Sequence, residues 1–288
     1  MNPQKYVVAV SGGVDSMALL HMLQARKRDS ITYIVAHYDH GIRPESHEDR
    51  ALVQKTAAQY GMPFESAEGH LGSNTSEAEA RTARYAFLRK VKDTYKADKI
   101  ITAHHQDDVI ETMIINVVRG TGPRGLAPMQ YQTDILRPLL AKTKQQLLTY
   151  AKQQSLLWHE DSTNTDENYL RNYIRLNITP KLETARQQLL TISESIDRLY
   201  LDIDMRISGI IYGKRTLYRP NFVYFPYIVQ KEIMRAWLVK TGVSEIDRQL
   251  IERATIAAKT LPHGKKIDLD GSYWLNSEKQ NIYITSKL

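Results

Sequence analysis

The first half of the chain alternates short apolar runs with longer amphipathic stretches. The apolar runs occupy residues 6–10, 31–36 and 99–103, with a weaker one at 64–66. Unbroken apolar runs are typical of parallel strands that are covered on both faces. The amphipathic stretches predict helices over residues 14–26, 46–60, 76–95 and 107–119. This alternation predicts an α/β fold built on a doubly wound parallel sheet.

The pattern changes after about residue 184. A further helix is expected over residues 144–154, and beyond residue 184 apolar positions recur at helical spacing from Leu189 to Ile203. Residues 266–275 predict a hairpin that turns at Asp270-Gly271, followed by a last strand near residue 283. We therefore expect two domains, residues 1–184 and residues 185–288, the second mostly helical.

The amino-acid composition limits the partners and the reactions that can be expected of this chain. The 288 residues include 39 Lys and Arg, 32 Asp and Glu and no Cys, which gives a net charge of +7. A positive field favours polyanionic partners such as nucleic acids or nucleotides, although an ordinary basic protein has the same balance. The absence of cysteine excludes disulfides, Cys-ligated zinc, iron–sulfur clusters and thiolate nucleophiles.

Neither export nor membrane insertion is predicted. The apolar run within Met1–Val10 is too short to span a bilayer and lacks a cleavage pattern, and no later stretch reaches the required length. We therefore expect a cytoplasmic protein.

A glycine-rich segment, Ser11-Gly12-Gly13-Val14-Asp15-Ser16, lies between the first apolar run and the first helix. Glycines let backbone N–H groups approach an oxyanion, the serines add hydroxyl donors, and the helix presents its positive N-terminus. A carboxylate such as Asp15 fits a phosphate site where it holds Mg²⁺ that bridges the phosphates. An ordinary turn is the alternative for Ser-Gly-Gly alone, but the complete hexapeptide predicts a phosphate site.

Titratable residues follow two further strands. Asp39 and His40 come just after the second apolar run, and His104, Asp108 and Glu111 follow the run at 99–103. Spacings of three and four residues place the latter set on one helix face. The carboxyl ends of parallel strands border the ligand crevice of an open α/β sheet, so these residues are candidates for a common site.

These residues also have structural alternatives. His104 can be a residue beside a helix cap that is satisfied by the backbone. The pairs His37/His40 and His104/His105 can suggest a metal site, but no cysteine supports one and the carboxylates fit Mg²⁺ better.

One glycine motif is rejected. Residues 120–125 formally match the dinucleotide fingerprint, but they follow a predicted helix and contain Pro123. The strand–turn–helix context that the fingerprint needs is absent. A loop that brings backbone close to a substrate or to RNA is the better interpretation.

The segments together resemble the PP-loop N-type ATP pyrophosphatases and, within them, the tRNA(Ile)-lysidine synthetase family. The resemblance covers roughly residues 5–182 in order. It rests on the PP-loop (residues 11–16), on residues 37–46 and 104–112, on Arg119–Met129, and on the segments Glu77–Leu88, Arg137–Leu140, Glu160–Asn164 and Arg171–Arg175. The departures are small: Ala103, Ile42 and Pro128 replace the usual residues.

The resemblance implies an ATP-dependent ligase. Enzymes of this family convert the wobble cytidine of an isoleucine tRNA with a CAU anticodon to lysidine. ATP adenylates the C2 oxygen of the base, pyrophosphate leaves, and the amine of free lysine then displaces AMP. The expected cofactors are ATP and Mg²⁺.

Site roles follow from the same resemblance and from residue type. The loop 11–16 with Asp39 and His40 would bind the nucleotide, and Asp15 would hold Mg²⁺. The expected catalytic residues are Asp15, Arg84, His104, Asp108 and Glu111. Arg84 suits a phosphate or developing charge, Asp108 and Glu111 the ammonium of lysine or its proton, and His104 proton transfer or the orientation of a carboxylate. The residues expected to contact substrate or tRNA are Arg84, Asp108, Glu111, Arg119, Arg171 and Arg175.

The resemblance also implies that residues 185–288 bind tRNA. The basic turns at 214–220 and 262–266 suit phosphate contacts, although solvated loops have the same composition. Family members are often homodimers, and the sequence leaves the oligomeric state open. The chain is too short for a clear third domain, so we expect a short or a truncated form. The general base and the basis for rejecting methionine tRNA also stay open.

Three other functions compete: a PP-loop enzyme acting on a small molecule, a tRNA thiolase of the same superfamily, and a nucleotide-binding module without catalysis. Thiolases typically rely on cysteine pairs or an iron–sulfur cluster, so a chain without cysteine disfavours that function. A binding module needs no acidic pair such as Asp108 and Glu111.

Overall fold

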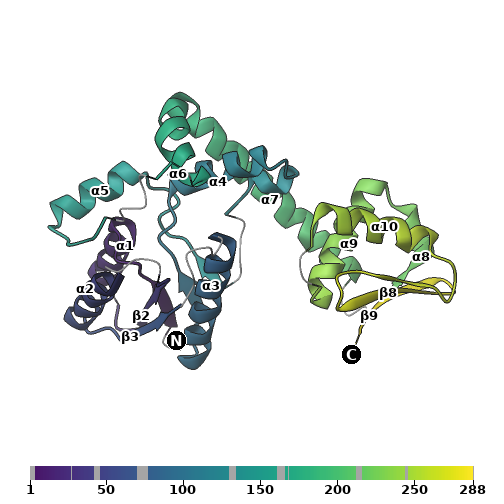
Figure 1. Ribbon diagram of the computed structural model, residues 1–288, viewed down its shortest axis with the longest axis horizontal. Coiled ribbons are helices and arrows are strands. Elements are labelled where there is room, and N and C mark those ends of the chain that lie inside the picture. Colours follow the sequence, from purple (N-terminus) through teal and green to yellow (C-terminus); the bar gives the residue numbers. More distant parts are fainter. Residues whose placement is uncertain are drawn as a thin grey trace. The chain divides into compact units, whose positions relative to one another are not determined.

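The computed structural model describes residues 4–26, 28–41, 46–69, 77–129, 134–160, 166–167, 169–211, 216–243 and 246–287. The chain divides into two compact units, residues 1–197 (unit 1) and residues 198–288 (unit 2). The division lies inside helix α7 (Arg186–Ile211), whereas the boundary expected from the sequence, between residues 184 and 185, lies just before this helix. Figure 1 shows the elements of each unit.

Unit 1 is built on a five-stranded parallel sheet with the order β3-β2-β1-β4-β5. Its strands are β1 (Gln4–Ala9), β2 (Ile31–Asp39), β3 (Phe64–Glu68), β4 (Lys99–Ile101) and β5 (Ile135–Leu136). Its main helices are α1 (Val14–Ala25), α2 (Ser46–Gln59), α3 (Glu77–Thr94), α4 (Gln106–Val118) and α5 (Lys144–Gln153). The doubly wound α/β fold is thereby confirmed.

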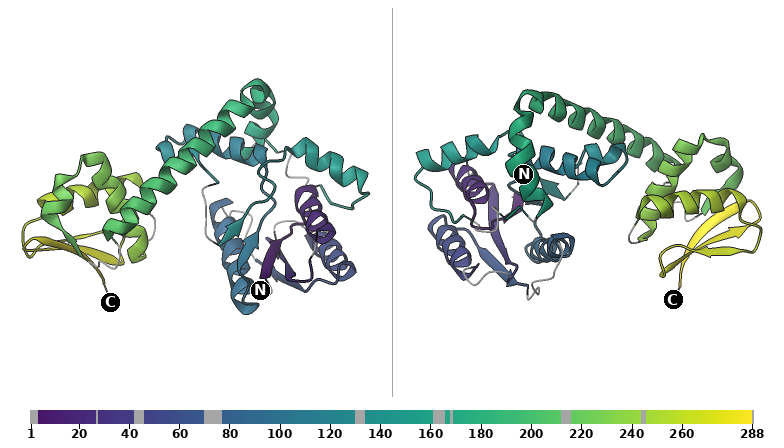
Figure 2. Two further views of the ribbon diagram at one scale, coloured as in Figure 1. Left: turned by 180° about the vertical axis from the view of Figure 1, so that it is seen from behind. Right: turned by 45° about the horizontal axis from the view of Figure 1, so that its top comes forward.

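Helices cover both faces of this sheet. On one face, Leu20 of α1 and Val53 of α2 are buried against Val8 of β1. On the other face, Leu88 of α3 is buried against Val7. The views in Figure 2 show these two helical layers. Because adjacent residues of β1 are buried on opposite faces, the strand has no polar positions in its centre.

The strand order reverses between β1 and β4. The chain adds β2 and β3 on one side of β1 and then returns through α3 to place β4 on the other side. Loops that leave neighbouring strands toward opposite sides open a crevice at the carboxyl edge of the sheet. The loops after β1 and β4 meet at this point.

The segment between α5 and α7 packs against α4. It contains α6 (Leu170–Tyr173), the π-helical turn η3 (Ile174–Ile178) and the 3₁₀ helix η4 (Thr179–Ala185). Buried Ile110 and Met113 of α4 lie in a cluster with Leu190 of α7. The 3₁₀ helix η1 (Pro123–Leu126) follows α4, so residues 120–125 lie after a helix, as predicted.

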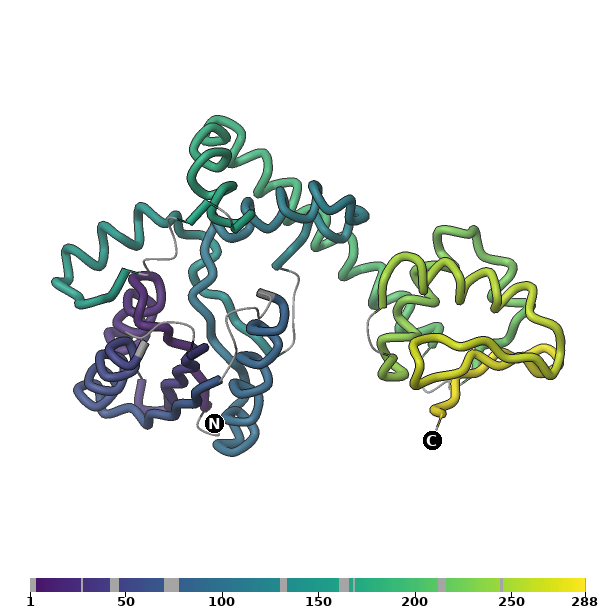
Figure 3. The backbone as a smooth tube through the Cα atoms, in the orientation of Figure 1, coloured from purple at the N-terminus to yellow at the C-terminus, as the bar shows by residue number. Residues whose placement is uncertain are grey.

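Unit 2 combines helices with a four-stranded antiparallel sheet of order β6-β9-β8-β7. The strands are β6 (Thr216–Tyr218), β7 (Lys266–Asp268), β8 (Tyr273–Glu278) and β9 (Asn281–Ser286), and the helices are α8 (Arg219–Tyr224), α9 (Tyr227–Thr241) and α10 (Arg248–Thr260). The predicted hairpin at Asp270-Gly271 joins β7 to β8, and Gly271 has the positive φ of 85° that such a turn requires. Figure 3 traces the hairpin. No helix in the described part of the chain is long and apolar enough to cross a membrane.

Candidate active site

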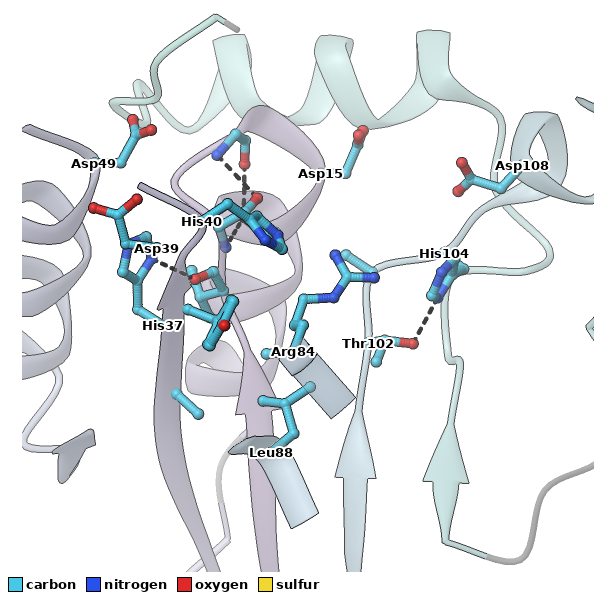
Figure 4. A pocket seen from close by; sticks show the side chains of 18 residues that line it. Asp15, His37, Asp39, His40, Asp49, Arg84, Leu88, Thr102, His104 and Asp108 are labelled. Atoms are coloured by element: carbon cyan, nitrogen blue, oxygen red, sulfur yellow. Dashed lines mark hydrogen bonds between the residues drawn. The ribbon is translucent and has the colours of Figure 1, made fainter. Parts of the chain in front are cut away.

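A cavity of about 430 Å³ opens at the carboxyl edge of the sheet in unit 1. Its walls come from the ends of β1 and β2, from the loops after β1, β2 and β4, and from helices α1 to α4. Nine residues that the sequence analysis selected line it: Ser11, Gly13, Asp15, Ser16, Asp39, His40, Arg84, His104 and Asp108. Figure 4 shows several of these side chains around one space. Segments that are far apart in the sequence therefore share one cavity.

The loop after β1 is closed by its own serine hydroxyls. The Oγ of Ser16 accepts a hydrogen bond from the N–H of Ser11 at 3.1 Å and donates to the carbonyl oxygen of Gly13 at 2.9 Å. Helix α1 begins at Val14, and its N-cap Gly13 offers no side-chain cap. The first N–H groups of α1 are thus left for an anion, which is the arrangement of a phosphate site.

Gly12 is held by two residues that the sequence analysis did not select. Its carbonyl oxygen accepts a hydrogen bond from the N–H of His159 at 3.1 Å. The Nδ1 of His159 donates to Oδ1 of Asp49 at 2.8 Å. Asp49 in turn lies close enough to Gly12 that a Cβ at position 12 would meet the Cβ of Asp49 at 3.1 Å. The only hint in the sequence is that Asp49 falls in the first turn of α2.

Substitution of Gly12 by alanine should lower the free energy of unfolding by about 1–3 kcal/mol, because a side chain is strained at its φ of 96° and would crowd Asp49. Gly13→Ala is the matched control. Gly13 has a φ of −75°, and an added Cβ would lie 3.6 Å from the Oγ of Ser11, an ordinary contact. Urea titrations should show a clear loss for Gly12→Ala only, and equal midpoints for the two variants would contradict this account.

Asp15 is bound by cations from two other segments. The Nζ of Lys144 lies 2.6 Å from its Oδ2, and the Nε2 of His105 lies 3.6 Å from the same oxygen. Burial raises the pKa of Asp15, but His105 and Lys144 outweigh this effect and hold the pKa below its usual value. The other oxygen, Oδ1, is buried and has no hydrogen-bond partner among the described residues. Asp15 therefore presents an ionised carboxylate with one oxygen still available.

His105, which belongs to the segment 104–112 and to a possible metal pair but was not expected as a site residue, lies among three carboxylates. Its Nε2 is 3.6 Å from Oδ2 of both Asp15 and Asp108, and its Nδ1 is 3.5 Å from Oδ2 of Asp107. Burial opposes the charge, but Asp107, Asp15 and Asp108 together raise the pKa of His105 to about 10. The imidazolium thus connects the loop after β1 to the start of α4.

His104 has the opposite character. Its Nδ1 lies 2.8 Å from the Oγ1 of Thr102. Burial is the main cause that lowers the pKa of His104 to about 3, against the attraction of Asp108. His104 is therefore a neutral imidazole at neutral pH, and the low pKa makes it a weak proton acceptor. The described residues contain no group of three or more His, Asp or Glu that could hold a metal ion.

Another wall of the cavity is formed by Asp39, His40 and Arg84. Asp39 ends β2, and its Oδ1 accepts a hydrogen bond from the N–H of Gly41 at 2.8 Å. Arg84 projects from α3 into the cavity (Figure 4). Burial and then the charge of Arg84 lower the pKa of His40, so His40 is neutral beside a guanidinium.

The two acidic residues of α4 have different surroundings. Asp108 lines the cavity, and its Oδ2 accepts a hydrogen bond from the N–H of His105 at 2.9 Å. Glu111 does not line it. Its side chain is 1% exposed and is bound by Arg175 through two hydrogen bonds of 2.8 and 2.9 Å, with Arg171 at 3.8 Å. Burial raises the pKa of Glu111, although Arg175 opposes this shift. Only Asp108 of the pair therefore reaches the cavity.

The remaining predicted residues lie outside the cavity lining. Gly12 and Val14 belong to the loop and the first turn of α1, and Arg119 is exposed just after α4. Arg171 and Arg175 do share a face, which is directed at Glu111. Parts of three motifs fall outside the described residues, namely residues 42–45, 161–164 and 214–215.

Comparison with known proteins gives consistent matches. A family described as the PP-loop domain matches residues 1–182. A tRNA(Ile)-lysidine synthase from Thermus thermophilus is 40% identical over 277 residues, which are 90% of this chain and 54% of that protein. One from a Thermotoga species is 36% identical over 203 residues, which are 67% of this chain and 48% of that protein. The chain therefore spans about half the length of these curated relatives.

A solved structure shares the fold. The U34-tRNA thiolase NcsA from Methanococcus maripaludis, with its 4Fe–4S cluster, matches 69% of this chain and 73% of its own, with a TM-score of 0.57 and 19% sequence identity. At this identity the likeness concerns the architecture alone.

Proposed function

Because this chain belongs to the PP-loop domain family, we propose that it is a cytoplasmic, ATP-dependent tRNA(Ile)-lysidine synthetase. It would ligate free lysine to C2 of the wobble cytidine of an isoleucine tRNA with a CAU anticodon, giving lysidine, AMP and pyrophosphate. The observation that carries the proposal is a single cavity that the phosphate loop, Arg84 and Asp108 line together. Relatives of that name, 36% and 40% identical to this chain, support it.

In the first step, the C2 oxygen of cytidine would attack the α-phosphorus of ATP, and the bond to the β-phosphate would break. The loop 11–16 would bind the phosphates through N–H and hydroxyl groups. Arg84 would stabilise the charge that develops on the transferred phosphoryl group. Asp39 and His40, at the end of β2, would bind the nucleoside.

Asp15 is suited to hold Mg²⁺. Its carboxylate is ionised, and its Oδ1 is buried with no hydrogen-bond partner among the described residues. In phosphate sites Mg²⁺ is commonly bound by one or two carboxylates together with substrate phosphates and water, so a single carboxylate fits. Bound there, the ion would neutralise phosphate charge. Lys144, on Oδ2, would fix the orientation of the carboxylate.

In the second step, the amine of lysine would attack C2 and lose a proton, and AMP would leave as the C2–O bond breaks. Asp108 would hold the ammonium of lysine or accept its proton, and His104, whose pKa is too low for an effective base, would orient a carboxylate. Glu111 is already bound to Arg175, so we propose that it positions Arg175 and Arg171 instead of touching lysine.

The tRNA would be bound by both domains. We propose residues 1–184 as the catalytic domain and residues 185–288 as a tRNA-binding domain. Exposed Arg119, after α4, would contact the tRNA backbone, and Arg171 and Arg175 would contact the tRNA or the nucleotide. A homodimer, frequent in the resembled family, is the assembly to test by sedimentation.

The decisive experiment combines the protein with an isoleucine tRNA transcript, ATP, Mg²⁺ and labelled lysine. We expect label at the wobble cytidine and one AMP, not ADP, for each lysine incorporated. A methionine tRNA transcript with the same anticodon is the control and should stay unlabelled. AMP formation without tRNA would indicate a small-molecule PP-loop enzyme, and AMP formation with another amine or acid would exclude lysine as the nucleophile.

Two of the competing functions fit less well. A thiolase with a cluster like that of NcsA would need cysteine ligands, and this sequence has none. A binding module without catalysis would have no use for Asp108 in the cavity that the phosphate loop lines.

A further inference from the structure

The positive charge of the chain is concentrated in unit 2. Residues 198–288 contain 15 Lys and Arg against 9 Asp and Glu, a net charge of +6, whereas residues 1–197 contain 24 against 23. The cavity lies in unit 1, so most of the field that attracts a polyanion originates outside the catalytic unit. Some surface of unit 2 is therefore expected to use this charge.

The sheet of unit 2 is covered on one face only. Leu217, Leu275 and Ile282 are buried against the helices, in the same core as Trp237 of α9. Side chains alternate along a strand, so the intervening residues point to the opposite face. We name this the outer sheet face; it carries Thr216, Tyr218, Lys266, Asp268, Trp274, Asn276, Glu278, Asn281, Tyr283 and Thr285. Tyr218 is 45% exposed, Trp274 and Tyr283 are half-buried, and no described element of unit 2 packs over this face (Figures 1 and 3).

Two lysines are held beside an aromatic ring on the outer sheet face. The Nζ atoms of Lys266 and Lys287 lie 4.3 and 4.4 Å from the centroid of Trp274. Lys287 also forms an ion pair with Asp268. Such cation–π contacts restrict long side chains, so two ammonium groups are presented at a defined place on the sheet.

We propose that the outer sheet face binds RNA, with phosphates on Lys266 and Lys287 and unpaired bases on Tyr218 and Tyr283. Basic side chains next to exposed aromatic rings bind RNA strands by combining phosphate attraction with base stacking. The net charge of +6 favours a polyanion over a protein partner. This inference rests on the proposed tRNA ligation, for which it names the surface outside the catalytic unit.

The test measures binding of an unmodified isoleucine tRNA transcript to the full chain at several salt concentrations. Lys266→Gln with Lys287→Gln should weaken binding roughly tenfold at 0.1 M salt and reduce the slope of log K against log salt by about 2. Tyr218→Ala with Tyr283→Ala should weaken binding by a similar factor and leave the salt slope nearly unchanged, because stacking releases no counterions.

The chain offers a matched control. Lys231 and Lys259 lie 5.0 and 5.2 Å from the ring of Tyr227 on the helical side of unit 2. Their change to glutamine removes the same charge from the same kind of cation–π site. We expect a much smaller loss of RNA affinity in this control, and melting curves for each variant separate loss of fold from loss of binding.

The outcomes distinguish the two proposals. If the unaltered chain forms lysidine, two results would overturn the RNA assignment of the outer sheet face and leave the proposed function intact. One is an equal loss of RNA affinity in the two lysine double variants. The other is wild-type RNA affinity in the variants of the outer sheet face. If the unaltered chain forms no lysidine but the variants of the outer sheet face bind RNA more weakly, the proposed function is wrong and the RNA assignment of this face stands. Absence of RNA binding by the unaltered chain would overturn both proposals. Binding of a protein but not of RNA to the outer sheet face would overturn its assignment to RNA.

Discussion

Replacement of Asp15 by alanine should abolish detectable AMP formation, a loss of turnover of about a hundred- to a thousandfold. Asp15 lines the cavity, is ionised, and keeps one oxygen available beside the phosphate loop. Its loss removes the carboxylate proposed for Mg²⁺. It also leaves Lys144 and His105 without the negative charge that both of them contact. Release of labelled pyrophosphate from ATP in the presence of isoleucine tRNA measures the effect.

Asp15→Asn tests whether charge or shape matters, because asparagine keeps the size of the side chain and loses the negative charge. Asp93→Asn is the control, since Asp93 lies on α3 with a side chain that is 76% exposed and should leave turnover unchanged. Retention of wild-type turnover in Asp15→Ala would remove the assignment of residues 11–16 as a phosphate-binding loop.

Replacement of Glu111 by glutamine should lower the free energy of unfolding by about 2–3 kcal/mol and greatly reduce lysine transfer. Removing one partner of a fully buried ion pair costs about 3–5 kcal/mol, and a smaller loss is expected here because the side chain of Arg175 is 36% exposed. Urea titration gives the stability, and a double-mutant cycle with Arg175→Met isolates the pair.

Glu183→Gln is the comparison for Glu111. Glu183 also accepts from an arginine, Arg186, at 2.9 Å, but its side chain is 67% exposed. Exposed pairs contribute about 0–1 kcal/mol, so this variant should stay close to the unaltered chain. A loss for Glu111→Gln no larger than that for Glu183→Gln would contradict the view that Glu111 positions Arg175 and Arg171.

Much of the fold follows from local patterns in the sequence. The apolar run before Ser11 forms β1, and the amphipathic stretches form α1 to α4 within a residue or two of the expected ends. The pattern succeeds here because the apolar run at residues 6–10 is too short for a helix and is rich in β-branched valine, as expected of a strand buried on both faces. The hairpin at Asp270-Gly271 was equally readable, because its turn chemistry is local.

The site was predictable where residues follow a strand directly. Asp39, His104 and Asp108 were selected because carboxyl ends of parallel strands converge. Lys144 could not be selected in this way, since it reaches Asp15 across 129 residues of sequence. The charge of His105 has the same origin, because it depends on Asp15 as well as on its neighbours Asp107 and Asp108.

The spacing of residues along a helix does not show which side chains enter the cavity, and this depends on where each side chain is buried. Spacings of three and four residues predicted one face for His104, Asp108 and Glu111, but His104 precedes α4 and Glu111 is turned into the ion pair with Arg175. A sequence pattern gives the direction of a side chain from its helix. It does not tell what occupies the space that the side chain enters.

Strands β1 and β4 are adjacent in the sheet but far apart in the sequence, and this affects how the protein folds while it is being synthesised. β1 pairs with β4 in a register that places Tyr6 opposite Lys99, and Asp15 receives Lys144 only from α5. Contacts between residues so far apart form slowly, because a long loop must close first. We therefore expect a nascent chain to form the loop 11–16 early, to gain His105 with the start of α4, and to lack Lys144 until α5 has left the ribosome. Nucleotide binding would then mark the docking of α5.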